Sequence, residues 1–166
     1  AIKKTLHLFF GDRPEESYSY GKIINEKQFN RLTGYLKQGE LIHGGRTNRE
    51  QLFIEPTILH NVSINDTIMK EEIFGPILPL ISFKTKEDAL KIIGQNKNPL
   101  AFYVFTSAKE KEEEWLNAVS FGGGCVNNCS WHLTNHSLPF GGRGFSGTGK
   151  YHGKYSFDTF SHEKAV

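Results

Sequence analysis

Cysteine, methionine and long apolar runs are all scarce in this sequence. It contains two cysteines and one methionine among 166 residues, and the methionine is Met69 rather than the first residue. Two cysteines are too few for a disulfide framework, and this usage favours a reducing, cytoplasmic location. No apolar run approaches the roughly 18 residues that a membrane-spanning helix needs. The missing initial Met indicates that the chain is a piece of something longer.

An excess of one charge is also lacking. Twenty Lys and Arg residues oppose eighteen Asp and Glu residues, which gives a formal net charge of +2. This balance gives no electrostatic argument for a nucleic-acid or anionic-membrane partner. The chain is instead 37% hydrophobic and 13% aromatic, with thirteen Phe. That composition is typical of one globular domain with an aromatic-rich core.

Hydrophobic periodicity predicts helices and strands in alternation. Helices are predicted at residues 1–10, 26–38, 86–94 and 108–119. Strands are predicted at residues 41–43, 52–59, 77–83, 101–106 and 123–127. The strand–helix–strand–helix–strand order over 77–127 predicts an α/β fold with a mainly parallel sheet flanked by helices. In such sheets, function gathers at the carboxyl ends of the strands.

Local signals support several of these boundaries. Asn25 is a plausible N-cap for the second helix, and Thr85 with Asp88 approximates a capping box for the third. Ser107 is predicted to cap the fourth helix. Pro56 interrupts the predicted strand 52–59, which indicates an edge or a bulge there because proline cannot donate to a ladder.

A G-x-G-x-x-G pattern occupies residues 142–147. A dinucleotide-binding loop needs a strand directly before this pattern and a helix directly after it. The preceding SLPFG and the following GTG fit neither requirement. The pattern therefore favours a close-packed, glycine-dependent loop near an active site over a phosphate cradle.

Cysteines and histidines gather in the irregular region after residue 124. Cys125, Cys129 and His132 have partial zinc-ligand spacing, but a second ligand pair is missing, so no metal site is assigned. No base is identifiable beside either cysteine, so neither is assigned as a nucleophile. His132, His136 and His152 are possible proton shuttles, although ordinary hydrogen bonding is the simpler interpretation of each.

The segment of residues 71–76 (EEIFGP) precedes a predicted buried strand. A carboxylate here could accept hydrogen bonds from ribose hydroxyls, and Phe74 could form the wall of a site for a planar ring. The spacing alone favours a simpler alternative, which is a turn with two solvated glutamates.

Several ordered segments resemble the aldehyde dehydrogenase superfamily. EEIFGP at residues 71–76 is similar to one motif of that family, and LPFGGRGFSGTG at 138–149 is similar to its P-F-G-G-x-x-x-S-G-x-G segment. YHGKYSFDTFSH at 151–162 resembles the class 3 and fatty aldehyde dehydrogenase branch in particular. Further segments fit in the family's order at residues 20–25, 55–59 and 98–101. The resemblance covers nearly the whole chain.

This resemblance implies an NAD- or NADP-dependent oxidation of an aldehyde to a carboxylic acid. In the family, a cysteine thiolate attacks the aldehyde to form a thiohemiacetal, hydride passes to the nicotinamide, and a glutamate-activated water releases the acid. Carried over to this sequence, Glu72 would hydrogen-bond the nicotinamide ribose and Phe74 would pack near the nicotinamide. Phe140 would line the aldehyde channel.

The resemblance also implies what this chain lacks. The family's nucleophilic cysteine, general-base glutamate, oxyanion-stabilising asparagine and Rossmann cofactor domain all lie upstream of the matched segments. We therefore interpret residues 1–156 as part of a catalytic domain and assign no catalytic residue within it. We expect the isolated chain to be inactive, and its expected partners are an aldehyde and the N-terminal cofactor domain of the same protein.

The last ten residues have a separate predicted role. The resemblance implies that the C-terminal strand takes part in subunit pairing, so residues 157–166, with alternating Phe157, Thr159 and Ser161, are expected to form a strand that pairs subunits in a homodimer. An exposed sheet edge is a ready template for such pairing. This segment also supports an alternative interpretation, in which the chain is a truncated, non-catalytic module that serves assembly. A reading frame that continues upstream of Ala1 would favour the enzyme.

Overall fold

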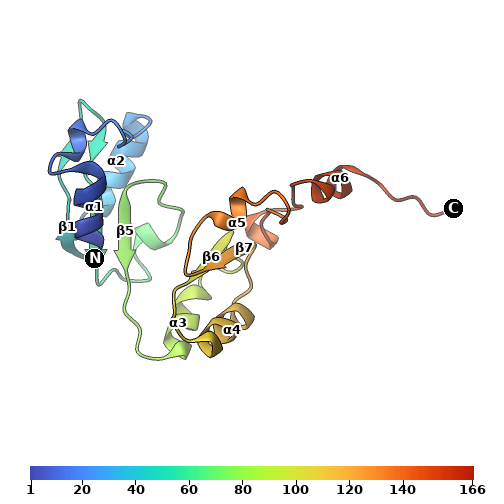
Figure 1. Ribbon diagram of the computed structural model, residues 1–166. Helices are drawn as coiled ribbons and strands as arrows, with labels where there is room; N and C mark the ends of the chain where they lie inside the picture. The colour runs from blue at the N-terminus through green and yellow to red at the C-terminus, as the bar shows by residue number, and fades with distance from the viewer. The chain divides into compact units, whose positions relative to one another are not determined.

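The computed structural model describes all 166 residues, and they divide into two compact units, residues 1–82 and 83–166. Figure 1 labels the elements of both units. The first unit contains α1 (Ile2–Phe10), α2 (Glu26–Tyr35), β1 (Glu40–His43), β2 (Thr47–Asn48), β3 (Phe53–Ile54), β4 (Thr57–His60) and β5 (Ile77–Leu80). Short 3-10 turns lie at Pro14–Glu16 and Thr67–Met69.

Two small sheets form in the first unit. Three strands pair in the order β1-β4-β5, with β1 antiparallel and β5 parallel to β4. The strands β2 and β3 form a separate antiparallel pair. The predicted single strand 52–59 is therefore wrong: it is divided into β3 and β4 at Glu55 and Pro56. The lack of an N–H on Pro56 explains why a ladder does not run through this point.

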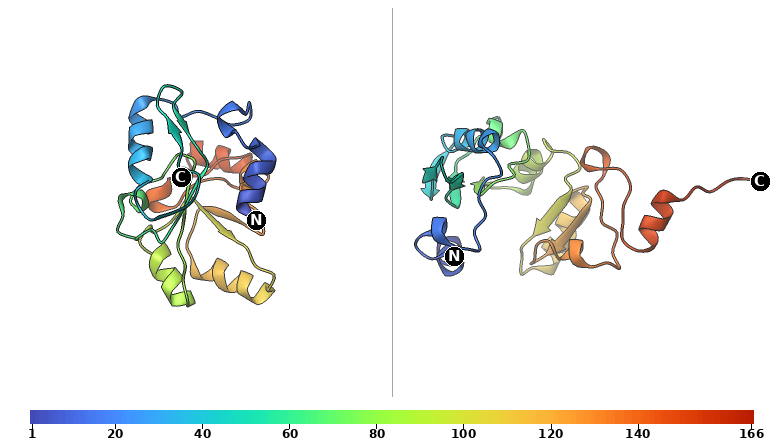
Figure 2. Two further views of the ribbon diagram at one scale, coloured as in Figure 1. Left: turned by 90° about the vertical axis from the view of Figure 1, so that its left-hand side faces the viewer. Right: turned by 90° about the horizontal axis from the view of Figure 1, so that it is seen from above.

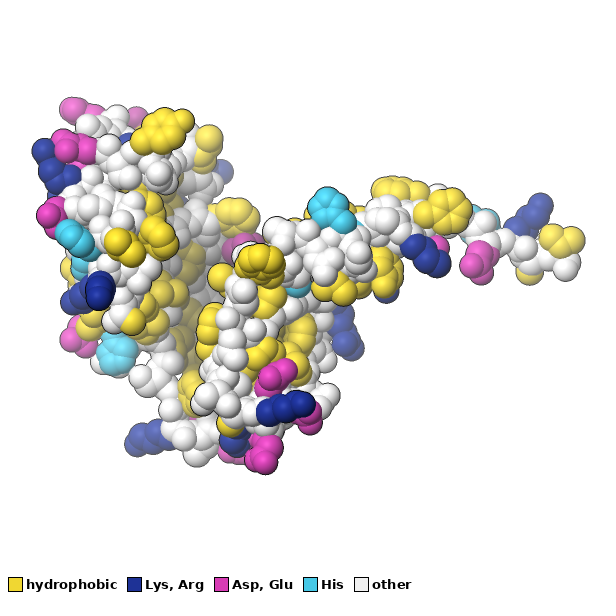
Figure 3. Space-filling view, in the orientation of Figure 1, with side chains coloured by type: hydrophobic (Ala, Val, Ile, Leu, Met, Phe, Trp, Pro, Cys, Tyr) yellow, Lys and Arg dark blue, Asp and Glu magenta, His cyan; other side chains and the backbone are white.

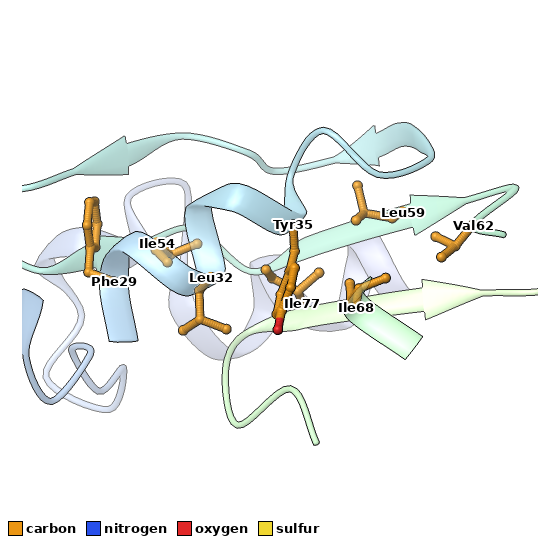
Figure 4. Close-up of a cluster of buried hydrophobic side chains, with 8 residues drawn as sticks. All are labelled: Phe29, Leu32, Tyr35, Ile54, Leu59, Val62, Ile68 and Ile77. Carbon is orange, nitrogen blue, oxygen red and sulfur yellow. The ribbon is translucent and has the colours of Figure 1, made fainter. Parts of the chain in front are cut away.

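The core of the first unit lies between α2 and the sheet. Asn25 caps α2 as predicted, since its Oδ1 accepts a hydrogen bond from the Gln28 amide at 2.9 Å. The helix ends at Tyr35, three residues earlier than predicted. Figure 4 shows its inward side chains beside those of the strands. The buried cluster comprises Phe29, Leu32, Tyr35, Ile54, Leu59, Val62, Ile68 and Ile77.

The second unit contains one strand pair and four helices. Its elements are α3 (Lys86–Ile93), β6 (Ala101–Val104), α4 (Lys109–Ala118), β7 (Gly123–Val126), α5 (Trp131–Thr134), a 3-10 turn at Gly144–Ser146 and α6 (Lys154–Phe160). The strands β6 and β7 lie side by side in parallel (Figures 1 and 2). The predicted capping box of α3 is confirmed, because Thr85 and Asp88 bond each other's backbone amides. Ser107 is not the cap of α4, which follows Ala108.

The prediction of a mainly parallel sheet is only partly confirmed. The fold is α/β, but its strands form three small sheets, two of which are parallel or mixed and one antiparallel. The strand β5 pairs with β4, whereas β6 has β7 as its partner, so no single sheet runs through residues 77–127. Alternation along the sequence identifies strands, but partner choice depends on contacts between distant segments.

The predicted C-terminal strand is wrong in this structure. Residues 157–160 belong to α6, and residues 161–166 have no regular structure. Lys154 and Asp158 form an ion pair at 2.6 Å one helical turn apart, a spacing that supports a helix rather than a strand. Phe157 and Phe160 stay exposed, and Figure 3 shows hydrophobic side chains on this part of the surface. No helix in the structure is long and apolar enough to cross a lipid bilayer.

Candidate functional site

A concavity of about 790 Å³ lies in the first unit, between α2 and the loop that leads into β5. Residues 21–24 and three side chains of α2 line one side of it. Glu72 and Phe74, the two cofactor-contacting residues that the sequence predicts, both line the other side. The structure thus places the two residues at one hollow large enough for part of a cofactor.

Phe74 projects from the protein at the rim of this concavity. Its side chain is 79% exposed, and its φ of 45° lies in the left-handed region that a bulky residue rarely adopts. The next residue, Gly75, fits closely against α2, because a Cβ there would lie 2.6 Å from Leu32 Cδ2. The backbone is therefore held in a conformation that turns an aromatic ring outward, where it can pack against a flat ligand.

Glu72 is exposed beside Phe74 and makes no hydrogen bond or ion pair within the chain. A carboxylate without a partner keeps both oxygens free to accept hydrogen bonds. A vicinal diol, such as that of a ribose, presents two hydroxyl donors to such a group. The chemistry and the position of Glu72 are therefore consistent with the predicted role.

Glu71, in contrast, is bonded to α2 through one of its two carboxylate oxygens. Its Oε1 accepts a hydrogen bond from Tyr35 Oη and an ion-pair contact from Arg31 Nη1 at 3.1 Å. The bond from Tyr35 and then the bond from Arg31 lower the pKa of Glu71. Burial and the bond to Glu71 raise the pKa of Tyr35. The two adjacent glutamates thus have different surroundings: Glu71 is bonded to α2, and the Glu72 carboxylate has no hydrogen-bond or ion-pair partner.

Sequence reasoning missed Arg31 and Tyr35. They stand four residues apart on α2, so they lie on one helical face, and the Arg31 guanidinium lies 5.5 Å from the centre of the Tyr35 ring. The only signal in the sequence is that spacing, since their partner Glu71 lies 40 and 36 residues away. No local pattern connects segments at that separation.

Phe140, the predicted channel residue, lies in an aromatic cluster of the second unit. Its backbone pairs with Tyr151 through reciprocal hydrogen bonds of 3.0 and 2.9 Å. Its ring is half-buried, with ring centres of His132, Tyr151 and His152 at 5.8, 5.4 and 6.4 Å. It is not among the residues that line the adjacent hollow of about 370 Å³, which is formed by the glycine-rich loop.

The glycine-rich loop depends on close backbone approach. A Cβ on Gly142 would lie 2.2 Å from the Ser146 carbonyl, and one on Gly141 would lie 2.3 Å from the Gly149 carbonyl. A 3-10 turn at Gly144–Ser146 follows, and no helix opens directly after it, since α6 begins only at Lys154. These contacts match the predicted close-packed loop and leave the G-x-G-x-x-G pattern without the helix that a phosphate cradle needs.

Of the two cysteines, only Cys125 lies beside a histidine in the structure. Cys125 Sγ lies 3.7 Å from Nδ1 of the buried His132, whereas Cys129 is exposed. The His136 and His152 rings stack with centres 5.0 Å apart, and His152 Nδ1 bonds the Leu138 carbonyl at 3.0 Å. His132 Nε2 is buried without a partner. His132 and His152 thus pack beside the Phe140 ring, and His152 makes the ordinary hydrogen bond expected of it.

Comparison with known proteins decides the family. The model of the aldehyde dehydrogenase family matches residues 1–166, the whole chain. The chain is an aldehyde dehydrogenase family member. It is 44% identical over 165 residues to aldehyde dehydrogenase family 3 member B1 of Homo sapiens, covering 99% of this chain and 35% of that protein. It is also 44% identical to the 4,4'-diaponeurosporen-aldehyde dehydrogenase of Staphylococcus aureus, with 99% and 36% coverage.

Solved aldehyde dehydrogenase structures agree with this assignment. A substrate-bound Staphylococcus aureus enzyme matches with a TM-score of 0.92 and 44% identity, over 98% of this chain and 36% of that one. A Mycobacterium tuberculosis aldehyde dehydrogenase complexed with NAD+ matches with a TM-score of 0.78 and 31% identity, over 89% and 32%. This family member therefore spans about a third of the length of its relatives, and the family uses NAD(P)+.

Proposed function

We propose that this chain is the C-terminal part of the catalytic domain of a class 3-like aldehyde dehydrogenase, in the branch that includes fatty aldehyde dehydrogenases. The whole protein would oxidise an aldehyde to a carboxylic acid with NAD or NADP through a cysteine thiohemiacetal. One observation carries the proposal: Glu72 and Phe74 are held outward at one concavity in a family whose solved members bind NAD+. A cytoplasmic location is part of the proposal.

In this proposal, the chain supplies binding and orientation. Glu72 accepts hydrogen bonds from the nicotinamide ribose, and Phe74 fixes the plane of the nicotinamide, which accepts the hydride when the cofactor is bound. The free carboxylate of Glu72 and the exposed ring of Phe74 support these roles. Phe140 lines the aldehyde channel, which its place beside the glycine-rich loop supports. The nucleophilic cysteine, the general-base glutamate and the Rossmann domain come from the upstream part of the protein.

The first test is the mass of the natural protein, detected in source cells with an antibody raised against this chain. A band of more than twice 18.8 kDa is expected. The purified 166-residue chain is expected to show no NAD-dependent turnover of any aldehyde. A band near 18.8 kDa, or turnover by the isolated chain, would overturn the proposal.

The second test is Glu72→Gln in the natural polypeptide. A hydrogen bond to a charged group contributes about 1.5–3 kcal/mol, so the KM for the cofactor should rise about 10- to 100-fold. Glu50→Gln is the matched control, since Glu50 is an exposed carboxylate of the same unit that makes no hydrogen bond or ion pair and does not line the concavity. An unchanged KM in Glu72→Gln would contradict the assigned role.

A second candidate function is a non-catalytic assembly module. It is favoured by Phe157 and Phe160 of α6, which are 72% and 89% exposed and present apolar surface to a partner subunit. The same surface would pair two subunits as a homodimer in the full enzyme. A natural product of 18.8 kDa that self-associates would favour the module over the enzyme.

A further inference from the structure

One side chain of α2 contacts both neighbours of Glu72. Arg31 Nη1 lies 3.1 Å from Glu71 Oε1, and Arg31 Nη2 donates a hydrogen bond of 2.6 Å to the Ile73 carbonyl. Glu72 stands between these two bonded residues and makes no hydrogen bond or ion pair of its own. The Glu71 side chain before it and the Ile73 carbonyl after it are therefore both tied to α2, while the Glu72 carboxylate stays free.

The guanidinium of Arg31 is itself held in place. Its Nε donates to Gln28 Oε1 at 2.7 Å, and its Nη1 also donates to Tyr35 Oη at 3.2 Å. Only 23% of the Arg31 side chain is exposed. All three guanidinium nitrogens are thus used, in a planar arrangement that the single ammonium group of a lysine cannot reproduce.

Leu32, the next residue of α2, also holds the 71–75 loop in place. Leu32 is fully buried and packs so closely on Gly75 that a Cβ there would have to displace the Leu32 side chain. Arg31 and Leu32 together hold positions 71, 73 and 75, and positions 72 and 74 alternate with them. The left-handed φ of 45° at Phe74 persists only while its surroundings enforce it, because the conformation is costly for an aromatic residue.

We propose that Arg31 is a positioning residue for cofactor binding, which fixes Glu72 and Phe74 through the Glu71 carboxylate and the Ile73 carbonyl. This inference rests on the proposed cofactor roles of Glu72 and Phe74. Arg31 acts through these two residues, so its effect depends on their presence. A displacement of about 1 Å in such a site can cost about a hundredfold in rate.

The test uses the natural polypeptide and the dissociation constant of NADH, followed by NADH fluorescence without aldehyde. Arg31→Met should raise that constant about tenfold, and Arg31→Lys should raise it nearly as much, because the charge alone does not make the bridge. Arg31→Met should also speed exchange of the Ile77 amide, which bonds the Gly75 carbonyl at 2.9 Å, in the cofactor-free protein. A dissociation constant of NADH in Arg31→Lys equal to that of the wild type would overturn the proposal.

A double-mutant comparison isolates the positioning role. Arg31→Met introduced into a Glu72→Gln, Phe74→Ala background should cause no further loss of NADH affinity, since the residues it positions are already gone. A further tenfold loss in that background would overturn the proposal, because it would show a direct contact or a general structural effect. If Glu72→Gln and Phe74→Ala leave affinity unchanged while Arg31→Met lowers it, the proposed function fails instead.

Arg49→Met is the matched control. Arg49 pairs with Glu26 of α2 at 3.3 Å and has no hydrogen bond or ion pair with the 71–75 loop. NADH affinity should be unchanged in this variant. Melting temperatures of all variants separate a local loss from unfolding, and a loss of affinity in Arg49→Met equal to that in Arg31→Met would overturn the proposal.

Discussion

The two units of the chain are stabilised in different ways. Of the thirteen buried hydrophobic residues, only Ala89, Val104 and Val119 belong to residues 83–166, and the other ten belong to residues 1–82. The first unit has a packed core against α2, so its candidate site is held by side chains from a rigid helix. The second unit holds its loop by glycine contacts and by rings around Phe140.

This difference means that opposite kinds of substitution should damage the two units. Removing volume should affect the first unit most, because its core side chains are fully enclosed. Adding volume should affect the loop of the second unit most, because its glycines have backbone atoms where a Cβ would lie. Volume-removing and volume-adding substitutions in the natural polypeptide therefore test whether the two units are stabilised in these different ways.

The largest effect is expected from Leu32→Ala. Leu32 is fully buried, and its loss leaves a cavity beneath Gly75, so the free energy of unfolding should fall by about 3 kcal/mol. Val119→Ala in the second unit removes about two methylene equivalents and should cost about 1.5 kcal/mol. Denaturant titration measures both values, and equal losses would contradict the contrast between the units.

A pair of glycine substitutions should have opposite signs. Gly142→Ala places a Cβ 2.2 Å from the Ser146 carbonyl and should cost about 2 kcal/mol, since backbone cannot move aside easily. Gly34→Ala lies on the exposed face of α2 with nothing within 4 Å, and should add about 1 kcal/mol of helix stability. Thermal unfolding of both variants checks the signs. A neutral Gly142→Ala would show that the loop is not tightly packed.

Helix caps should contribute equally in the two units. Asn25 caps α2 and Thr85 caps α3, each through one side-chain oxygen that accepts a backbone N–H. Asn25→Ala and Thr85→Ala should therefore each cost about 1 kcal/mol. Unfolding midpoints provide the measurement. A large difference between the two would show that the caps depend on the surrounding core rather than on the local hydrogen bond alone.

These caps also show how much of the fold the sequence predicts. Asn25, Thr85 and the helix over residues 1–10 are determined by neighbours within one turn, and the structure confirms them. The prediction of a mainly parallel sheet is confirmed only in part, because strand pairing depends on partners far along the chain. The predicted C-terminal strand is not formed, because local pairs such as Lys154 with Asp158 support a helix there instead. Local sequence signals predict where a helix or strand forms better than they predict which other strand it pairs with.

The candidate site shows the same division. A motif of adjacent residues predicts Glu72 and Phe74, and the structure places them at one concavity. No such motif predicts Arg31, because its contacts with Glu71 and Ile73 join residues that are 40 and 42 positions apart. Phe140 lies beside the glycine-rich loop, but its ring packs among other rings, and its role in an aldehyde channel stays a prediction because no sequence pattern indicates the direction of that side chain.

The smallest effect concerns pH and the bridge between Glu71 and α2. Hydrogen bonds from Tyr35 and Arg31 lower the pKa of Glu71, so the stabilisation is complete above the ordinary carboxyl pKa and is lost as the pH falls through the lowered value. The difference in melting temperature between wild type and Glu71→Gln should be constant from about pH 7 to 5 and shrink below about pH 4.3. Glu50→Gln, which removes an exposed carboxylate without a hydrogen bond or ion pair, is the control. A difference that grows in acid would contradict the bridge, because it would mean that protonated Glu71 is the better partner.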